Sequence, residues 1–210
     1  MGDVRLGDNP RAAVSRATFY FDLGSPYVYL AAERLQTALP EPIQWQPVLL
    51  GGLFKLTGRS SWALGDHRRR QAGMAEIEQR ASRYGLPAIH WPDPWPTDYL
   101  LAMRAATFAF TVGRGREFAM QALRDAFQRG RDLSARTNVM HAAEQAGLDP
   151  ADVQDAVGDP QIKGALRQAT DAAHELGVFG VPTLAIGNDI FWGDDRIEDA
   201  VVRLDSSRAS

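Results

Sequence analysis

The chain has 210 residues, of which 45% are hydrophobic and 23% charged, as is typical of one soluble globular domain or one domain with a large insertion. A net charge of −3 leaves no broad basic surface for nucleic acid, and no run of about 18 apolar residues could cross a membrane. The first sixteen residues lack the apolar run of a signal peptide, so we expect a cytoplasmic protein with a loose N-terminal tail over residues 1–16.

The chain contains no cysteine. This excludes disulfides, thiolate metal ligands and cysteine nucleophiles supplied by the protein itself. The four histidines have no ligand-like spacing, so no metal site is predicted. Any sulfur chemistry would therefore need a thiol from a bound molecule.

A strand, a helix and a second strand are predicted in the first third of the chain. The β-prone run 18–21 is closed by the turn 22–24. Ser25 and Pro26 then begin a helix, because serine is a preferred N-cap and proline lacks the N–H that the first helical position leaves unpaired. Residues 43–48 alternate apolar and polar side chains as a strand does, so a parallel β-α-β unit is expected.

From about residue 51 to residue 177 the pattern changes to helices. Three prolines and two tryptophans in the segment 89–96 exclude a regular helix or a central strand there. A helix is predicted after the cluster 66–70 and runs to Tyr84. Further helices are predicted over residues 98–112, 116–128, 135–146, 150–157 and 159–176.

The last part of the chain returns to strands. Residues 181–186 and 190–192 are predicted to form a hairpin, followed by a helix over residues 194–204. Strands at both ends with helices between them predict an α/β fold. We expect a thioredoxin-like domain built from residues 17–50 and 177–206, with an inserted helical domain over residues 51–176.

Ser25 is the first candidate functional residue. At the N-terminus of a helix, unpaired backbone N–H groups and the helix dipole favour a negative charge, and a serine hydroxyl there donates a hydrogen bond to an anion. The alternative is that Ser25 only caps its own helix, which is the commoner use of serine.

Two segments near the C-terminus carry similar alternatives. Pro182 follows Val181 through a peptide bond that is either trans or cis, and only about 5–6% of such bonds are cis. Asp194 and Asp195 either cap a helix or form a site for the ammonium group of a ligand.

The remaining candidates lie in the helical part of the sequence. Trp91 and Trp95 either pack beneath a loop or form an aromatic wall for a planar substrate. The arginine-rich cluster 66–70 indicates a solvated helix start rather than a phosphate site.

Three segments, taken together, resemble a known family. FYFDLGSPYVYLAAERL, PVLLGGLFKLTG and GVFGVPTLAIGNDIFWGDDRIED, in this order and at this separation, resemble the 2-hydroxychromene-2-carboxylate isomerase family. That family has a DsbA-like thioredoxin fold and is related to the kappa-class glutathione transferases. The likeness extends from Thr18 to about Leu204.

The resemblance implies a glutathione site. Ser25 matches the family's catalytic serine, which faces the thiol of bound glutathione. The backbone of Val181 matches the group that pairs with the cysteinyl part of glutathione, and Pro182 matches the cis-proline of the fold. The γ-glutamyl end is held by the stretch that corresponds to Trp192, Gly193, Asp194 and Asp195.

The match is looser on the side of the second substrate. Lys55 corresponds to a lysine near that substrate, and Trp95 falls near an aromatic contact. The segment 58–62, Arg69 and Arg70 depart from the family pattern, and all of them border the second substrate.

The function implied is a glutathione-dependent isomerase of an aromatic, 2-hydroxychromene-carboxylate-like compound, active as a homodimer. The glutathione thiolate acts as a nucleophilic cofactor that adds to a conjugated carbon and leaves again. The alternatives are a kappa-like glutathione transferase and a non-catalytic binding module of the same fold. A DsbA-type disulfide oxidoreductase is excluded, because the chain has no cysteine.

Overall fold

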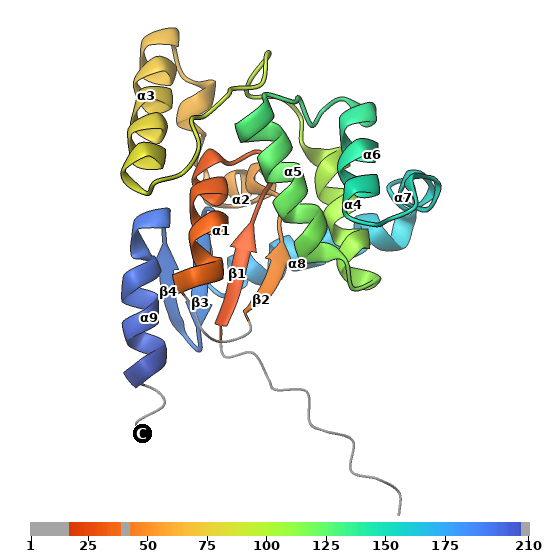
Figure 1. The fold of residues 1–210 in the computed structure, drawn as a ribbon. Coiled ribbons are helices and arrows are strands. Elements are labelled where there is room, and N and C mark those ends of the chain that lie inside the picture. Colours follow the sequence, from red (N-terminus) through yellow and green to blue (C-terminus); the bar gives the residue numbers. More distant parts are fainter. Residues whose placement is uncertain (1–16, 39–42, 207–210) are drawn as a thin grey trace, which may run out of the picture.

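The computed structural model describes residues 17–38 and 43–206 (Figure 1). The tail predicted over residues 1–16 lies outside these residues. A four-stranded sheet forms the centre, with the strand order β2-β1-β3-β4. Its strands are β1 (Ala17–Phe21), β2 (Gln44–Pro47), β3 (Thr183–Ile186) and β4 (Asp189–Trp192).

The sheet is mixed. β1 runs parallel to β2, while β1 and β3 and also β3 and β4 pair antiparallel. The parallel pair is joined by α1 (Pro26–Ala38), as the predicted β-α-β unit requires. β3 and β4 form the predicted hairpin, and the pairing of β3 with β1 brings the first and last strands of the described residues into one sheet. The α/β thioredoxin-like fold is confirmed.

Helices cover both faces of the sheet (Figure 1). α1 and α9 (Ile197–Ser206) lie together on one face, and α2 (Leu50–Thr57) and α8 (Pro160–Glu175) lie on the other. All four strands fall within residues 17–50 and 177–206. α8 comes from the segment predicted as an inserted helical domain, yet it packs against β2.

The remaining helices extend beyond the sheet. α3 (His67–Arg83) lies near α1 and above α9, whereas α4 to α7 gather beside β2 (Figure 1). Their bounds are Leu100–Thr111 for α4, Gly115–Arg129 for α5, Arg136–Gln145 for α6 and Pro150–Ala156 for α7. None of the helices in the described ranges is both long and apolar enough to cross a membrane.

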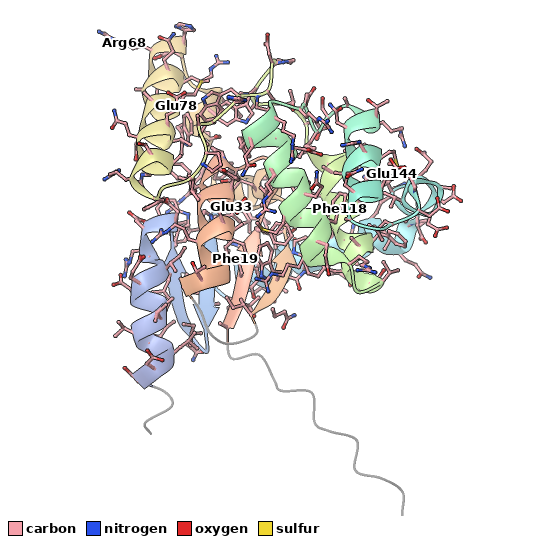
Figure 2. All side chains as sticks on the ribbon, in the orientation of Figure 1. Phe19, Glu33, Arg68, Glu78, Phe118 and Glu144 are labelled. Atoms are coloured by element: carbon pink, nitrogen blue, oxygen red, sulfur yellow. The ribbon has the colours of Figure 1, made fainter. Side chains whose placement is uncertain are left out.

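The core is aromatic where the sheet meets its helices. Phe19 and Phe21 of β1 are fully buried, with ring centroids 6.1 Å apart, and the ring of Trp45 from β2 lies 4.8 Å from that of Phe19. In Figure 2, Phe19 lies in the interior, whereas Arg68 projects outward from the upper end of α3. Burial of these rings fixes the register of β1, since a shift by one residue would expose them.

α2 was not predicted from the sequence. It begins with Leu50 and continues through Gly51 and Gly52, and glycine has low helix propensity. A Cβ atom at position 52 would lie only 3.0 Å from Cγ2 of Thr170, so glycine lets α2 approach α8 closely. Packing between these helices therefore outweighs local propensity.

Candidate functional site

A pocket of about 310 Å³ opens where β1 ends and α1 begins. Its walls come from five parts of the chain that are distant in sequence. They are the turn 22–27, the start of α2, the segment 61–64, the loop 95–100 and the residues just before β3, with Trp192 at the rim. We call this the aromatic pocket, because tryptophan and tyrosine rings form much of its lining.

Ser25 lies in the wall of the aromatic pocket. Its side chain is 4% exposed, and its Oγ accepts a long hydrogen bond of 3.4 Å from the backbone N–H of Val28. Ser25 therefore does cap α1, as the simpler interpretation expected. Within the described residues its hydroxyl proton has no acceptor. This leaves the proton available for a ligand atom in the pocket.

The segment before β3 faces Ser25 across the same pocket. The Val181–Pro182 bond is cis, as the resemblance implies. Val181 is 6% exposed, and within residues 17–38 and 43–206 neither its N–H nor its C=O forms a hydrogen bond. The C=O of Pro182, by contrast, accepts the N–H of Gly193 at 3.0 Å. Buried backbone groups are nearly always paired, so Val181 offers a donor and an acceptor to a peptide-like ligand.

A second pocket, of about 260 Å³, adjoins the first. Tyr27, Trp62, Val181 and Trp192 border both pockets. The second pocket adds charged side chains from α3 and from the turn after β4, namely Arg80, Asp194 and Asp195. We call it the charged pocket.

The two aspartates of the charged pocket differ in role. The side chain of Asp194 is 1% exposed, and its oxygens are held by Nη1 of Arg80 and by the hydroxyl of Tyr84, both at 2.9 Å. Burial raises the pKa of Asp194, while Tyr84 and Arg80 oppose the rise. Both carboxylate oxygens of Asp194 are therefore occupied by partners within the protein.

Asp195 is the carboxylate left for a ligand. Its side chain is 58% exposed, and one oxygen lies 3.6 Å from Nη1 of Arg80. Asp195 could not be distinguished from Asp194 by sequence, because both follow Gly193 at the start of a helical turn. The structure divides them into one structural carboxylate and one that faces the pocket.

The two tentative substrate residues, Lys55 and Trp95, also differ in position. Trp95 is largely buried and lines the aromatic pocket, with its ring 5.5 Å from that of Trp62. Lys55 is exposed in the last turn of α2 and lines neither pocket, so its place near the substrate stays a prediction. Successive side chains on a helix point about 100° apart, which turns Phe54 into the pocket and Lys55 away from it.

Two further rings line the aromatic pocket: that of Trp62, in the segment 58–62 that the resemblance placed beside the second substrate, and that of Tyr99, which was missed from the sequence. Trp62 lies in a short 3₁₀ turn (Trp62–Leu64), and its ring packs on Gly73 of α3. The ring of Tyr99 packs on Gly24, where a Cβ atom would lie 2.4 Å from it. Only long-range packing brings these rings to the site.

Asp22, also missed, connects two walls of the aromatic pocket. Its Oδ1 accepts the N–H of Gly24 and its Oδ2 accepts the N–H of Leu50, each at 2.8 Å. The carboxylate thus ties the turn before Ser25 to the first residue of α2. A carboxylate directly after a buried strand was the signal that could have identified it.

Burial raises the pKa of Asp22 to about 6, against 3.8 for an exposed carboxyl group. A raised pKa means that Asp22 contributes its full stability below about pH 4 and loses it as the pH rises through about 6. Relative to Asp22→Asn, the free energy of unfolding of the wild type should therefore fall by about 3 kcal/mol from about pH 4 to pH 7. Urea unfolding of both proteins across this range measures the difference, and a constant difference would contradict the expectation.

Comparison with known proteins places this fold in a family. The family model of the DsbA-like thioredoxin domain matches residues 17–205, and the chain belongs to that family. The resemblance drawn from the three sequence segments is therefore confirmed at the level of the fold family.

Two individual proteins illustrate which members of the family this chain is similar to. The chain is similar to 2-hydroxychromene-2-carboxylate isomerase of Sphingobium xenophagum, with 28% identity over 192 residues that cover 86% of this chain and 93% of the relative. It is similar to glutathione S-transferase kappa 1 of Homo sapiens, with 27% identity over 210 residues that cover 92% of this chain and 90% of the relative.

Solved structures agree on the fold. A structure of 2-hydroxychromene-2-carboxylate isomerase superposes with a TM-score of 0.79 at 21% identity, over 92% of this chain and 97% of that one. The cytosolic disulfide reductase DsbM of Pseudomonas aeruginosa, in a structure with GSH, superposes with a TM-score of 0.64 at 14% identity, over 92% and 99%. The relatives are isomerases and glutathione transferases, so the chain is related to enzymes of both kinds.

Proposed function

We propose that this chain is a glutathione-dependent isomerase of an aromatic, chromene-like substrate. The observation that carries the proposal is the unpaired, buried backbone of Val181 beside the Ser25 hydroxyl in one pocket. A peptide that bears a thiol fits this combination of groups. The similarity to 2-hydroxychromene-2-carboxylate isomerases supports the reaction class.

The residues present match the parts of glutathione. Val181 would pair through its N–H and C=O with the cysteinyl residue, as a neighbouring strand does. Asp195 would meet the γ-glutamyl ammonium group in the charged pocket, where it has exposed surface. Ser25 would then face the sulfur, because Ser25 and Val181 line the same pocket.

Bound glutathione would supply a thiolate, which adds to a conjugated carbon and later leaves. The protein has to favour the thiolate form and orient it. The Ser25 hydroxyl would donate a hydrogen bond to the sulfur, and the N-terminus of α1 would favour its negative charge. A serine cannot form a mixed disulfide with the ligand, so the sulfur stays free to react.

Calorimetry with glutathione tests the proposed site. The wild type should bind glutathione, and Asp195→Asn should weaken binding about tenfold, because an ionic hydrogen bond contributes about 1.5–3 kcal/mol. Asp199→Asn is the matched control, since Asp199 is exposed, pairs with Arg196 and lines neither pocket. Absence of binding at millimolar glutathione would overturn the enzyme proposal and leave a non-catalytic binding module.

A kappa-like glutathione transferase is the second candidate, favoured by the 27% identity to the human kappa 1 enzyme. The two activities differ in the fate of glutathione. An isomerase returns glutathione unchanged after turnover, whereas a transferase consumes it in proportion to product. Quantifying free thiol after complete conversion of substrate distinguishes them.

A further inference from the structure

The aromatic pocket has an unusual charge balance for an enzyme whose relatives act on a carboxylate. Of the described residues that line it, none is lysine, arginine or histidine. The carboxylic acids among these described residues are Asp22, which is buried, and Asp98, which is exposed. Lys55 faces solvent on α2. Arg80 of the adjoining charged pocket, whose guanidinium carbon lies 5.5 Å from the centre of the Tyr27 ring, is paired with Glu76 and Asp194.

Both oxygens of Asp22 are already engaged, because they accept backbone N–H groups at 2.8 Å. Asp98 is exposed, and its Oδ1 accepts the N–H of Leu100 at 2.9 Å. Their negative charge nonetheless acts on whatever enters the pocket. A carboxylate would lose its hydration there without gaining a cationic side chain from the lining, and the N-terminus of α1 is the place proposed for the thiolate.

The other polar groups of the pocket are neutral. Burial raises the pKa of Tyr27 to about 12, so its hydroxyl stays protonated at neutral pH. The hydroxyl of Tyr99 is buried behind its ring, and burial raises its pKa to about 12 as well. Ser61 adds a further hydroxyl, and the rings of Trp62 and Trp95 supply flat apolar surface. Hydroxyl groups on apolar walls suit an aromatic molecule with uncharged oxygen atoms.

We propose that the second substrate of this enzyme is an uncharged aromatic electrophile, such as a ring ketone, ester or quinone, rather than an aromatic carboxylate. This inference rests on the proposed function in one respect, namely that the aromatic molecule bound in the pocket is a substrate. The selectivity of the pocket for uncharged over anionic aromatic molecules follows from its lining alone.

A matched pair of probes tests the selectivity without turnover. 2-Acetylnaphthalene and 2-naphthoate have the same ring and differ in charge, and their dissociation constants can be measured by quenching of tryptophan fluorescence at pH 7.5. The ketone should bind at least about tenfold more tightly than the carboxylate, a difference of about 1.4 kcal/mol. Equal binding, or tighter binding of the carboxylate, would overturn the inference.

Asp98 provides a variant that folds, because it is exposed and lies in a loop. Asp98→Lys should tighten binding of 2-naphthoate by about tenfold or more and leave the ketone within about threefold. Asp93→Asn is the matched control, since Asp93 is an exposed acid of the same proline-rich segment that does not line the pocket. If Asp98→Lys left both dissociation constants unchanged, the charge of the rim would not select the ligand and the inference would fail.

These measurements separate the inference from the proposed function. The naphthalene probes are measured without glutathione, so their ratio reports on the aromatic pocket even if glutathione does not bind. Failure of glutathione binding with a retained preference for the ketone would overturn the proposed function alone. Glutathione binding with a preference for the carboxylate would overturn the substrate inference alone.

Discussion

Replacing Ser25 with alanine should raise the pKa of the thiol group of bound glutathione toward about 8.5, the value for a free thiol. Without the hydroxyl, the thiolate loses a buried hydrogen-bond donor, and less of it is present at neutral pH. We expect kcat/KM to fall about 100-fold, the order of magnitude for removing one donor from a reacting anion. The ultraviolet absorbance of the thiolate, titrated in the complex, measures the pKa directly.

The effect of Ser25→Ala on folding should be small. The hydroxyl caps α1 only through the 3.4 Å contact to Val28, so its loss should cost about 1 kcal/mol or less. Asp149→Ala is the matched control, because Asp149 caps the remote helix α7 through the N–H of Ala151. It should cost similar stability and leave the thiol pKa unchanged. A thiol pKa that is the same in Ser25→Ala and wild type would remove the assigned role of Ser25.

Replacing Arg80 with methionine should lower the free energy of unfolding by about 3–5 kcal/mol. The substitution leaves the carboxylate of Asp194, which is 1% exposed, without its ion-pair partner, and an uncompensated buried charge costs that much. The hydroxyl of Tyr84 remains, but it is uncharged. Chemical denaturation at neutral pH measures the loss.

The loss in Arg80→Met should shrink as the pH falls. Without Arg80, the pKa of Asp194 rises further, so the carboxyl group takes up a proton sooner and the buried charge disappears. Arg203→Met is the control, because Arg203 pairs with Asp189 on the surface and should cost less than about 1 kcal/mol. Equal losses in the two variants would show that the Arg80–Asp194 pair is not a special stabilising contact.

Much of the fold was predictable because its signals are local. The N-cap serine and the proline at the first helical position identified the start of α1, and the capping aspartates Asp149 and Asp159 precede α7 and α8. α2 was missed because its two glycines oppose the helical pattern, and its stability comes from contact with α8. Tertiary packing of that kind leaves no trace in a short window of sequence.

The candidate site, like the fold, could be predicted only where its residues lie in local sequence motifs. Ser25, Val181 and Asp195 lie in short motifs at the ends of strands, and the structure brings all three to adjoining pockets. Tyr99 could not be assigned, because its ring reaches the pocket by packing on the distant Gly24. The orientation of Lys55 could not be predicted, because the helix that carries it was not foreseen.

The shared border of the two pockets has a consequence for inhibition. Because Tyr27, Trp62, Val181 and Trp192 line both, a molecule in the charged pocket lies against the same side chains as a molecule in the aromatic pocket. If glutathione binds as proposed, a single compound that joins the glutathione backbone through its sulfur to an uncharged aromatic ring would reach both pockets and lose its translational freedom in one binding event instead of two. Such a bisubstrate compound should therefore bind more tightly than either of its parts, with the linking atom beside Ser25.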